Sequence, residues 1–272
     1  MTYFGFLVGF VIIPIVLLSL WQLLDRRSKE LRSRINQNFH LFYSFIILTS
    51  LALVYTTPWD NYLVASGVWW YDPDLVLGFT FGWVPLEEYL FFVLQPILGG
   101  LLLLVLLRRR PGSGENEPLK DGARKILPSI AITIWATALT MLVLGIPAAT
   151  YLGLELVWAL PVIILQLVFG ADILWKYRSQ LFAVILGLTI FLSLGDAIAI
   201  QSGIWTINPE QSLGLLLAGI LPVEEFIFFL LTNIMVGFGF VLIWSPESQT
   251  RIADLARKIK IREHISNLRS EL

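Results

Sequence analysis

The sequence predicts an all-α integral membrane protein with seven transmembrane helices. Of its 272 residues, 57% are hydrophobic and only 14% are charged, and the mean hydropathy is +0.76. A soluble domain carries about 25% charged residues. Seven apolar segments are long enough to cross a hydrocarbon core of about 30 Å. They cover approximately residues 2–24, 39–57, 77–107, 126–145, 154–175, 181–200 and 213–244. In the third and seventh segments we expect a short lead-in, a break at Pro85 or Pro222, and then the main helix.

Basic residues predict the orientation of these helices. All 19 Lys and Arg residues fall in four segments, 26–34, 108–125, 176–178 and 251–269. With seven spans, all four segments lie on one face, which the positive-inside rule assigns to the cytoplasm. We therefore expect a multi-pass protein of the cell (cytoplasmic) membrane, with the N-terminus outside and the C-terminus inside. Residues 246–272 are expected to form a cytoplasmic basic tail, either a membrane-surface amphipathic helix or a solvated segment.

One motif occurs twice, each time inside an otherwise apolar run. Both copies contain a proline, one spacer, two adjacent glutamates and, after two more residues, an aromatic pair. A carboxylate in hydrocarbon costs about 2.5–3.5 kcal/mol even on the mildest insertion scale, so two matching glutamate pairs indicate a functional site. The copies are Gly82-Trp-Val-Pro-Leu-Glu-Glu-Tyr-Leu-Phe-Phe92 and Gly219-Ile-Leu-Pro-Val-Glu-Glu-Phe-Ile-Phe-Phe229.

The repetition extends beyond the glutamates and predicts the domain organisation. Residues upstream of the first motif recur 136 positions later, and one inserted residue then aligns Pro85 with Pro222 at an offset of 137. Residues 1–108 and 151–245 are therefore predicted to be three-helix repeats, with 109–150 as a linker and an extra transmembrane helix. The extra crossing makes the two repeats parallel and places both glutamate pairs at the same depth, toward the outer face. The recurring residues are Asp60, Ser66-Gly67, Trp69, Pro73 and Gly78, followed by Asp196, Ser202-Gly203, Trp205, Pro209 and Gly214.

The four glutamates of the motifs are the candidate catalytic residues. Adjacent carboxyl groups in a low dielectric cannot both ionise cheaply, whereas the helix N-terminus after each proline favours one anion. A proton donor beside an acceptor is what acid–base catalysis requires. Neighbouring residues on a helix point about 100° apart, and we expect Glu87 and Glu224 to face the pocket with Glu88 and Glu225 as their partners. The alternative is that the glutamates cap broken helices or lie among lipid headgroups.

A second group of residues is predicted to line the pocket because its members are repeated or lie close to the glutamates. Aromatic faces beside a proton donor can stabilise a carbocation by about 1–2 kcal/mol per ring. The alternative for Phe is lipid contact or packing, and for Trp a place in the interfacial belt. Two further acids, Glu155 and Asp172, have no repeated counterpart and are interpreted as boundary residues. The pocket candidates are Phe91, Phe92, Phe228, Phe229, Pro85, Pro222, Asp60, Asp196, Trp69 and Trp205.

Several chemistries are excluded by composition. The chain has no cysteine, and its two histidines, His40 and His264, lie at a membrane edge and in the charged tail, so no metal site is expected. There is no dinucleotide-binding motif, and no lysine lies inside a predicted span to form a retinal Schiff base. No cofactor and no nucleic-acid partner are expected.

Two three-helix units that each end in Pro-x-Glu-Glu-x-x-Phe-Phe, after a Ser-Gly-x-Trp loop, resemble the lycopene cyclase domain family of membrane-integral carotenoid cyclases. The resemblance covers nearly the whole chain, in the fused two-repeat form. It implies that an acid protonates the terminal double bond of a lycopene ψ-end, the next double bond closes the ring, and a base removes a proton. The products are γ-carotene and then β-carotene, without net redox and without flavin. The implied partners are lycopene, the lipid bilayer and other enzymes of the carotenoid pathway.

Two other functions are compatible with the same sequence. A cyclase for fifty-carbon carotenoids or a mono-cyclase fits the same motifs. A small transporter also fits, since parallel repeats and intramembrane carboxylates are natural in carriers. The sequence does not distinguish the acid from the base among the glutamates.

Overall fold

The fold is seen in a computed structural model that describes residues 1–24, 41–109 and 122–270, with side chains as far as residue 259. The basic segment 26–34, the linker at 110–121 and His40 lie outside the described residues, as does the side chain of His264. Predictions that concern those positions stay predictions.

Seven helices of the described chain are long and apolar enough to span a membrane, which confirms the predicted number. The second continues through Pro58 to Ala65, so Asp60 lies within the helix. Their bounds are Tyr3–Leu24 (α1 Tyr3–Leu7, the π-helix η1 Val8–Ile12 and α2 Ile13–Leu24), α4 Leu41–Ala65, α5 Leu86–Arg109, α6 Ala123–Val143, Pro147–Lys176 (the 3-10 turn η2 Pro147–Ala149 and α7 Thr150–Lys176), α8 Arg178–Gln201 and α9 Val223–Trp244.

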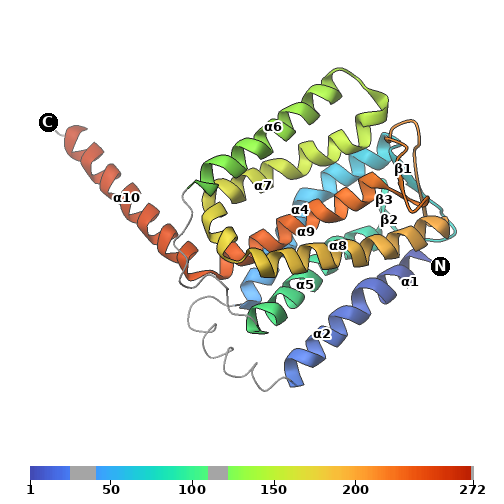
Figure 1. Cartoon of the computed structure of the whole chain (residues 1–272), viewed down its shortest axis with the longest axis horizontal. Helices are drawn as coiled ribbons and strands as arrows, with labels where there is room; N and C mark the ends of the chain where they lie inside the picture. Colours follow the sequence, from blue (N-terminus) through green and yellow to red (C-terminus); the bar gives the residue numbers. More distant parts are fainter. Residues whose placement is uncertain (25–40, 110–121, 271–272) are drawn as a thin grey trace.

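Helices α5 and α9, which carry the two glutamate pairs, pack against each other in the middle of the bundle. A buried hydrogen bond joins them, from Gln95 Nε2 to Asn233 Oδ1 at 2.7 Å. Helices α2, α4 and α8 also contact α5, whereas α4, α7 and α8 contact α9. Helix α6 lies at the edge of the bundle along α7 (Figure 1).

Short strands occupy the connections at the end of the bundle where the N-terminus lies (Figure 1). Strand β1 (Trp69–Tyr71) pairs antiparallel with β4 (Trp205–Ile207), and the register is centred on Trp70 opposite Thr206. The predicted lead-ins before Pro85 and Pro222 are not helical. They form two-stranded hairpins, β2 (Thr80–Phe81) with β3 (Val84–Pro85) and β5 (Leu216–Leu217) with β6 (Leu221–Pro222), and the helices begin at the next residue.

Backbone hydrogen bonds recur between residues related by the sequence repeat. The amide of Asp72 donates to the carbonyl of Ile204 at 2.9 Å, and the amide of Asn208 donates to the carbonyl of Val68 at 2.8 Å. Each bond joins one half of the chain to the other. Asn208 and Ile204 are the repeat equivalents of Asp72 and Val68 at the offset of 136, so the two bonds are equivalent and run in opposite directions between the halves. Glycines with positive φ recur at the same offset, for example Gly67 (72°) and Gly203 (76°), a conformation that a side chain disfavours.

The last helix, α10 (Pro246–Ser270), extends away from the end of the bundle opposite the N-terminus (Figure 1). Its first turns are fixed to α7 by a bidentate ion pair from Arg251 to Asp172, with N–O distances of 2.9 and 2.5 Å. A second ion pair joins Lys176 to Glu247 at 2.6 Å. These charge-assisted bonds attach the beginning of the predicted tail to α7.

Candidate active site

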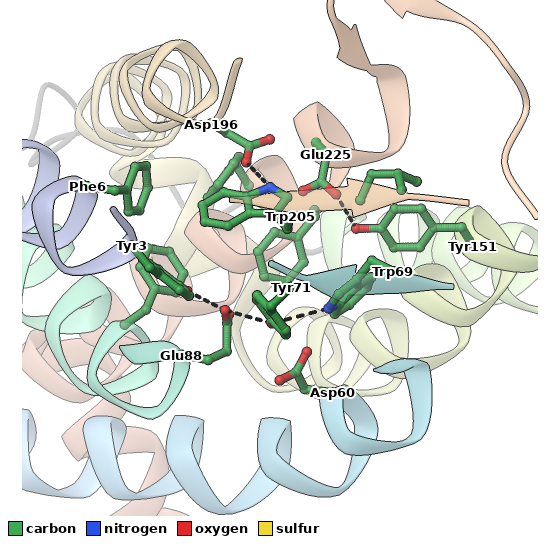
Figure 2. Close-up of a pocket in the computed structure, with 14 residues that line it drawn as sticks. Tyr3, Phe6, Asp60, Trp69, Tyr71, Glu88, Tyr151, Asp196, Trp205 and Glu225 are labelled. Atoms are coloured by element: carbon green, nitrogen blue, oxygen red, sulfur yellow. Dashed lines mark hydrogen bonds between the residues drawn. The ribbon is translucent and has the colours of Figure 1, made fainter. Parts of the chain in front are cut away.

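A cavity of about 50 Å³ lies beneath the β1–β4 pair, where the two halves of the chain meet. Four carboxyl groups line it, from Asp60 on α4, Glu88 on α5, Asp196 on α8 and Glu225 on α9 (Figure 2). We call this cavity the acid chamber. Its remaining lining residues are tyrosines, tryptophans and other apolar side chains, namely Tyr3, Phe6, Trp69, Tyr71, Phe91, Tyr151, Trp205, Ile207, Phe228 and Phe229.

The acid chamber has no lysine, arginine or histidine among its lining residues. Asp60 and Asp196 are each 1% exposed. One oxygen of each, Oδ2, has no hydrogen-bond partner within the described structure. Four ionised carboxylates without a cation cannot be stable in such a space, so the chamber holds fewer charges than carboxyl groups. Some of these carboxyl groups therefore keep their protons and can act as proton donors.

Glu88 accepts hydrogen bonds from two phenols. Tyr3 on α1 and Tyr71 on β1 both donate to Glu88 Oε2, and the bond from Tyr71 measures 3.0 Å. Trp69 Nε1 in turn donates to the Tyr71 hydroxyl at 3.2 Å. Burial and the nearby carboxyl groups of Asp60 and Glu88 raise the pKa of Tyr71 well above its ordinary value. The Tyr71 phenol therefore keeps its proton and acts as a donor to Glu88.

Glu225 has one phenol partner. The Tyr151 hydroxyl, at the start of α7, donates to Glu225 Oε1 at 2.7 Å. Nearby, Trp205 Nε1 donates to Asp196 Oδ1 at 2.9 Å. Figure 2 shows this pair of bonds facing the Tyr3–Glu88–Tyr71 group across the chamber.

The prediction that Glu87 and Glu224 face the pocket is wrong, because neither lines the acid chamber. Both are fully buried, but Glu87 Oε1 accepts from the amide of Leu77 at 2.6 Å and Glu224 Oε1 accepts from the amide of Leu213 at 2.6 Å. Each glutamate thus holds the loop that precedes its own hairpin. These two contacts accompany the turn of Glu87 and Glu224 away from the chamber.

The aromatic residues of the two halves interlock around the chamber. The Tyr3 ring lies 4.9 Å from that of Trp205, and the Tyr151 ring lies 5.3 Å from that of Trp69. Each tyrosine thus contacts the tryptophan of the opposite half. Trp69 and Trp205 are 7% and 9% exposed, so they are pocket residues and not part of an interfacial belt.

Of the other predicted pocket residues, Phe91, Phe228 and Phe229 line the acid chamber. Pro85 and Pro222 end the hairpins and do not line it. Phe92 lines a second cavity, of about 230 Å³, which also includes Phe91 and Phe228. We call this second cavity the lateral groove.

The lateral groove runs between α4 and α7, with α5 and α9 behind it. It reaches the outer surface of the bundle, where Leu51 is 59% and Tyr55 40% exposed. Phe91 and Phe228 belong to both cavities and therefore form the wall between the groove and the acid chamber. The remaining lining is mostly apolar and consists of Leu48, Ala52, Thr56, Gln95, Trp158, Val162, Gln166, Thr232, Met235 and Val236.

The tyrosines of the chamber are not among the residues predicted from the sequence. Tyr3 and Tyr151 occupy the same place near the start of the first helix of each half. Each amide donates to a loop of its own half, Tyr3 to the carbonyl of Leu75 and Tyr151 to that of Gln211, both at 2.9 Å. Extending the repeat into these helices could have found them. Glu155, predicted to be a boundary residue, lies in the second turn of α7 and is fully buried, and neither carboxyl oxygen has a hydrogen-bond partner among the described residues.

The described chain thus combines seven helices that are long and apolar enough to span a membrane with a cluster of buried carboxyl groups surrounded by aromatic residues. A family model described as lycopene cyclase matches residues 1–106 and 148–243. The chain belongs to the lycopene cyclase family, whose members are enzymes that cyclise carotenoids.

Named relatives agree with this assignment. A lycopene beta-cyclase of Halobacterium salinarum is 40% identical over 196 residues, which cover 72% of this chain and 80% of the relative. A bifunctional lycopene cyclase/phytoene synthase of Aspergillus oryzae is 35% identical over 202 residues, or 72% of this chain and 33% of that protein. The corresponding bifunctional protein of Podospora anserina is 34% identical over 203 residues, with 72% and 34% coverage. No solved structure gives a significant match.

The structural role of Glu87 can be tested by its stability. Replacing Glu87 with Ala removes the acceptor of the Leu77 amide and should lower the free energy of unfolding by about 0.5–1.5 kcal/mol. Glu87→Gln keeps an acceptor oxygen and should lose less. Thermal unfolding of the detergent-solubilised proteins would measure the difference, and equal stability of Glu87→Ala and the parent would contradict the assignment.

Proposed function

We propose that this protein is a lycopene β-cyclase that converts lycopene through γ-carotene to β-carotene. The observation that carries this proposal is the acid chamber, in which Glu88 and Glu225 share one aromatic cavity with Asp60 and Asp196. The relative from Halobacterium salinarum is a lycopene beta-cyclase by name, which supports the same reaction. Cyclisation is an isomerisation, so it needs an acid, a base and protection from water, and the chamber supplies these from its own side chains.

The reaction begins when one carboxyl group protonates the terminal double bond of a ψ-end. The resulting tertiary cation is attacked by the next double bond, which closes a six-membered ring and moves the positive charge onto the ring. A second carboxyl group then removes a ring proton. The rings of Phe91, Phe228 and Phe229 line the chamber and shield the cation from water, and an aromatic face favours a nearby positive charge.

The lateral groove is proposed to hold the part of the polyene that is not reacting. Lycopene is a hydrocarbon dissolved in the bilayer, so it must enter from the side of the bundle. The groove opens beside the exposed Leu51 and ends at Phe91 and Phe228, which separate it from the acid chamber. The chamber itself, at about 50 Å³, is smaller than one end group of the substrate, so these two phenylalanines must move when the end group enters.

Two parallel three-helix repeats joined by the extra helix α6 are proposed as the architecture. The family match supports this division, since it omits residues 107–147, where α6 lies. The hydrogen bonds exchanged between Asp72 and Ile204 and between Asn208 and Val68 support a two-fold relation between the halves. The distribution of Lys and Arg supports an N-terminus outside and a C-terminus inside the cell membrane.

Pigment analysis of lycopene-accumulating cells tests the reaction. The parent should produce β-carotene, whereas Glu88→Gln and Glu225→Gln should each lose at least about a hundredfold in conversion, because a lost acid or base costs 10²–10⁴ in rate. The matched controls are Glu87→Gln and Glu224→Gln, which keep their loop contacts and should retain most of the activity. Unchanged lycopene with a folded parent would overturn the proposed function. Loss of activity only in the control pair would overturn the choice of glutamates.

Filling the lateral groove tests its role in substrate binding. Ala52→Trp places a large ring in the groove and should reduce conversion at least about tenfold, because an overpacked site cannot admit the polyene. Ala183→Trp, on an exposed position of α8, is the matched control and should convert lycopene like the parent. Full activity of a folded Ala52→Trp protein would contradict this role.

Topology can be read from single cysteines, because the natural chain has none. Ser66 lies exposed beside β1 and Thr250 lies exposed on α10. A membrane-impermeant maleimide should label Ser66→Cys on intact cells and Thr250→Cys only after the membrane is opened. The reverse pattern would contradict the proposed orientation.

A further inference from the structure

The two halves of the acid chamber differ at one position that contacts a glutamate. Tyr71 and Ile207 are equivalent at the repeat offset of 136, and both line the chamber. Because β1 and β4 pair about Trp70 and Thr206, the two side chains occupy matching places in the strands. Tyr71 donates a hydrogen bond to Glu88, whereas Ile207 has no hydrogen-bonding group to offer Glu225. Glu88 therefore has two phenol donors and Glu225 has one.

The tryptophans follow the same asymmetry. Trp205 Nε1 donates directly to Asp196, but its counterpart Trp69 donates to the Tyr71 hydroxyl. In the first half, Trp69 therefore donates to Tyr71, and Tyr71 donates to Glu88 Oε2. Hydrogen bonds donated to a carboxylate favour its charged form, so these bonds stabilise a proton acceptor.

The second half instead contains an additional acid. Glu155 lies one helical turn after Tyr151 on α7, and the equivalent position one turn after Tyr3 is Leu7. Glu155 is fully buried, and neither of its oxygens has a partner within the described residues. The three acids of this half, Glu155, Asp196 and Glu225, thus share two donors, since Tyr151 donates to Glu225 and Trp205 donates to Asp196. Three neighbouring buried acids with only two donors between them favour the protonated form more than Glu88 does, because Glu88 alone receives two donors.

We propose that Glu225 is the general acid and Glu88 the general base of the reaction, and that Tyr71 is the positioning residue that separates the two roles. This inference rests on the proposed cyclase function. It also assigns Glu155 as a further buried acid on the donor side, from which the proton of Glu225 can be restored.

Each step balances within the chamber. The Glu225 O–H bond breaks and its proton adds to carbon 2 of the ψ-end, using the electrons of the double bond between carbons 1 and 2. The electrons of the next double bond form the bond between carbons 1 and 6 and leave the cation at carbon 5. The Glu88 carboxylate takes the proton from carbon 6, and the C–H electrons form the double bond between carbons 5 and 6. The proton gained by Glu88 equals the proton lost by Glu225, so exchange with the solvent resets the site without an oxidant or a reductant.

Cyclisation in heavy water separates the two roles. In membranes equilibrated with D₂O and supplied with lycopene, the parent should place one deuterium in each ring that forms. Glu225→Gln should leave lycopene that carries no deuterium, because protonation is the step that it loses. Glu88→Gln should still take up deuterium, in recovered lycopene or in rings whose double bond is displaced, because only the final deprotonation is impaired. Mass spectrometry of the extracted pigments measures both.

Deuterium uptake by Glu225→Gln but not by Glu88→Gln would reverse the assignment and overturn it. The absence of deuterium in both variants would also overturn it, since both glutamates would then be needed for protonation. In both cases the parent protein forms β-rings in the same assay. A parent that leaves lycopene unchanged contradicts the proposed function itself.

Tyr71→Phe provides a test that does not remove a carboxyl group. Losing one donor to a charged acceptor should raise the share of rings with a displaced double bond, or of labelled uncyclised lycopene, by about tenfold. Tyr151→Phe, the matched removal of the single phenol at Glu225, should not raise that share. Equal product ratios in the two variants would contradict a positioning role for Tyr71 and leave it a packing residue.

Discussion

The structure depends on one constraint, the burial of several carboxyl groups in a small space with no cation among the residues that line it. Asp60, Glu88, Asp196 and Glu225 surround the same cavity, and the partners available to them are phenols and indoles. An uncompensated buried charge costs several kcal/mol, so such a group of acids persists only if protons are shared among them. A cyclase that works without redox chemistry needs carboxyl groups that can donate and accept protons in this way.

The chamber exists because two halves of the chain meet at the β1–β4 pair. Tyr3 of the first half packs on Trp205 of the second, and Tyr151 packs on Trp69 in return. Neither half alone encloses the cavity, since its acids come from α4 and α5 on one side and from α8 and α9 on the other. The two sides of this cavity are chemically unequal, because Tyr71 corresponds to Ile207 at the sequence offset of 136 and Glu155 follows Tyr151 where Leu7 follows Tyr3.

Sequence patterns predicted the seven spans, because each is a long apolar run, and they located the acids, because a repeated carboxylate in such a run is conspicuous. The same patterns did not predict correctly which of Glu87 and Glu88 faces the cavity. Glu87 accepts a hydrogen bond from the amide of Leu77, in the loop before the hairpin. The periodicity of the helix contains no information about this contact. Tyr3 was missed for a related reason, since it lies 85 residues from Glu88 and meets it only through tertiary packing.

The most direct test of the shared chamber is an experimental structure with a non-reactive analogue of lycopene bound. One end group should lie between Glu88 and Glu225, with Phe91 and Phe228 displaced and the polyene leaving along the lateral groove between α4 and α7. An end group bound beside Glu87 or Glu224, or two separate end-group sites with one in each half, would contradict a single acid–base chamber built from both halves.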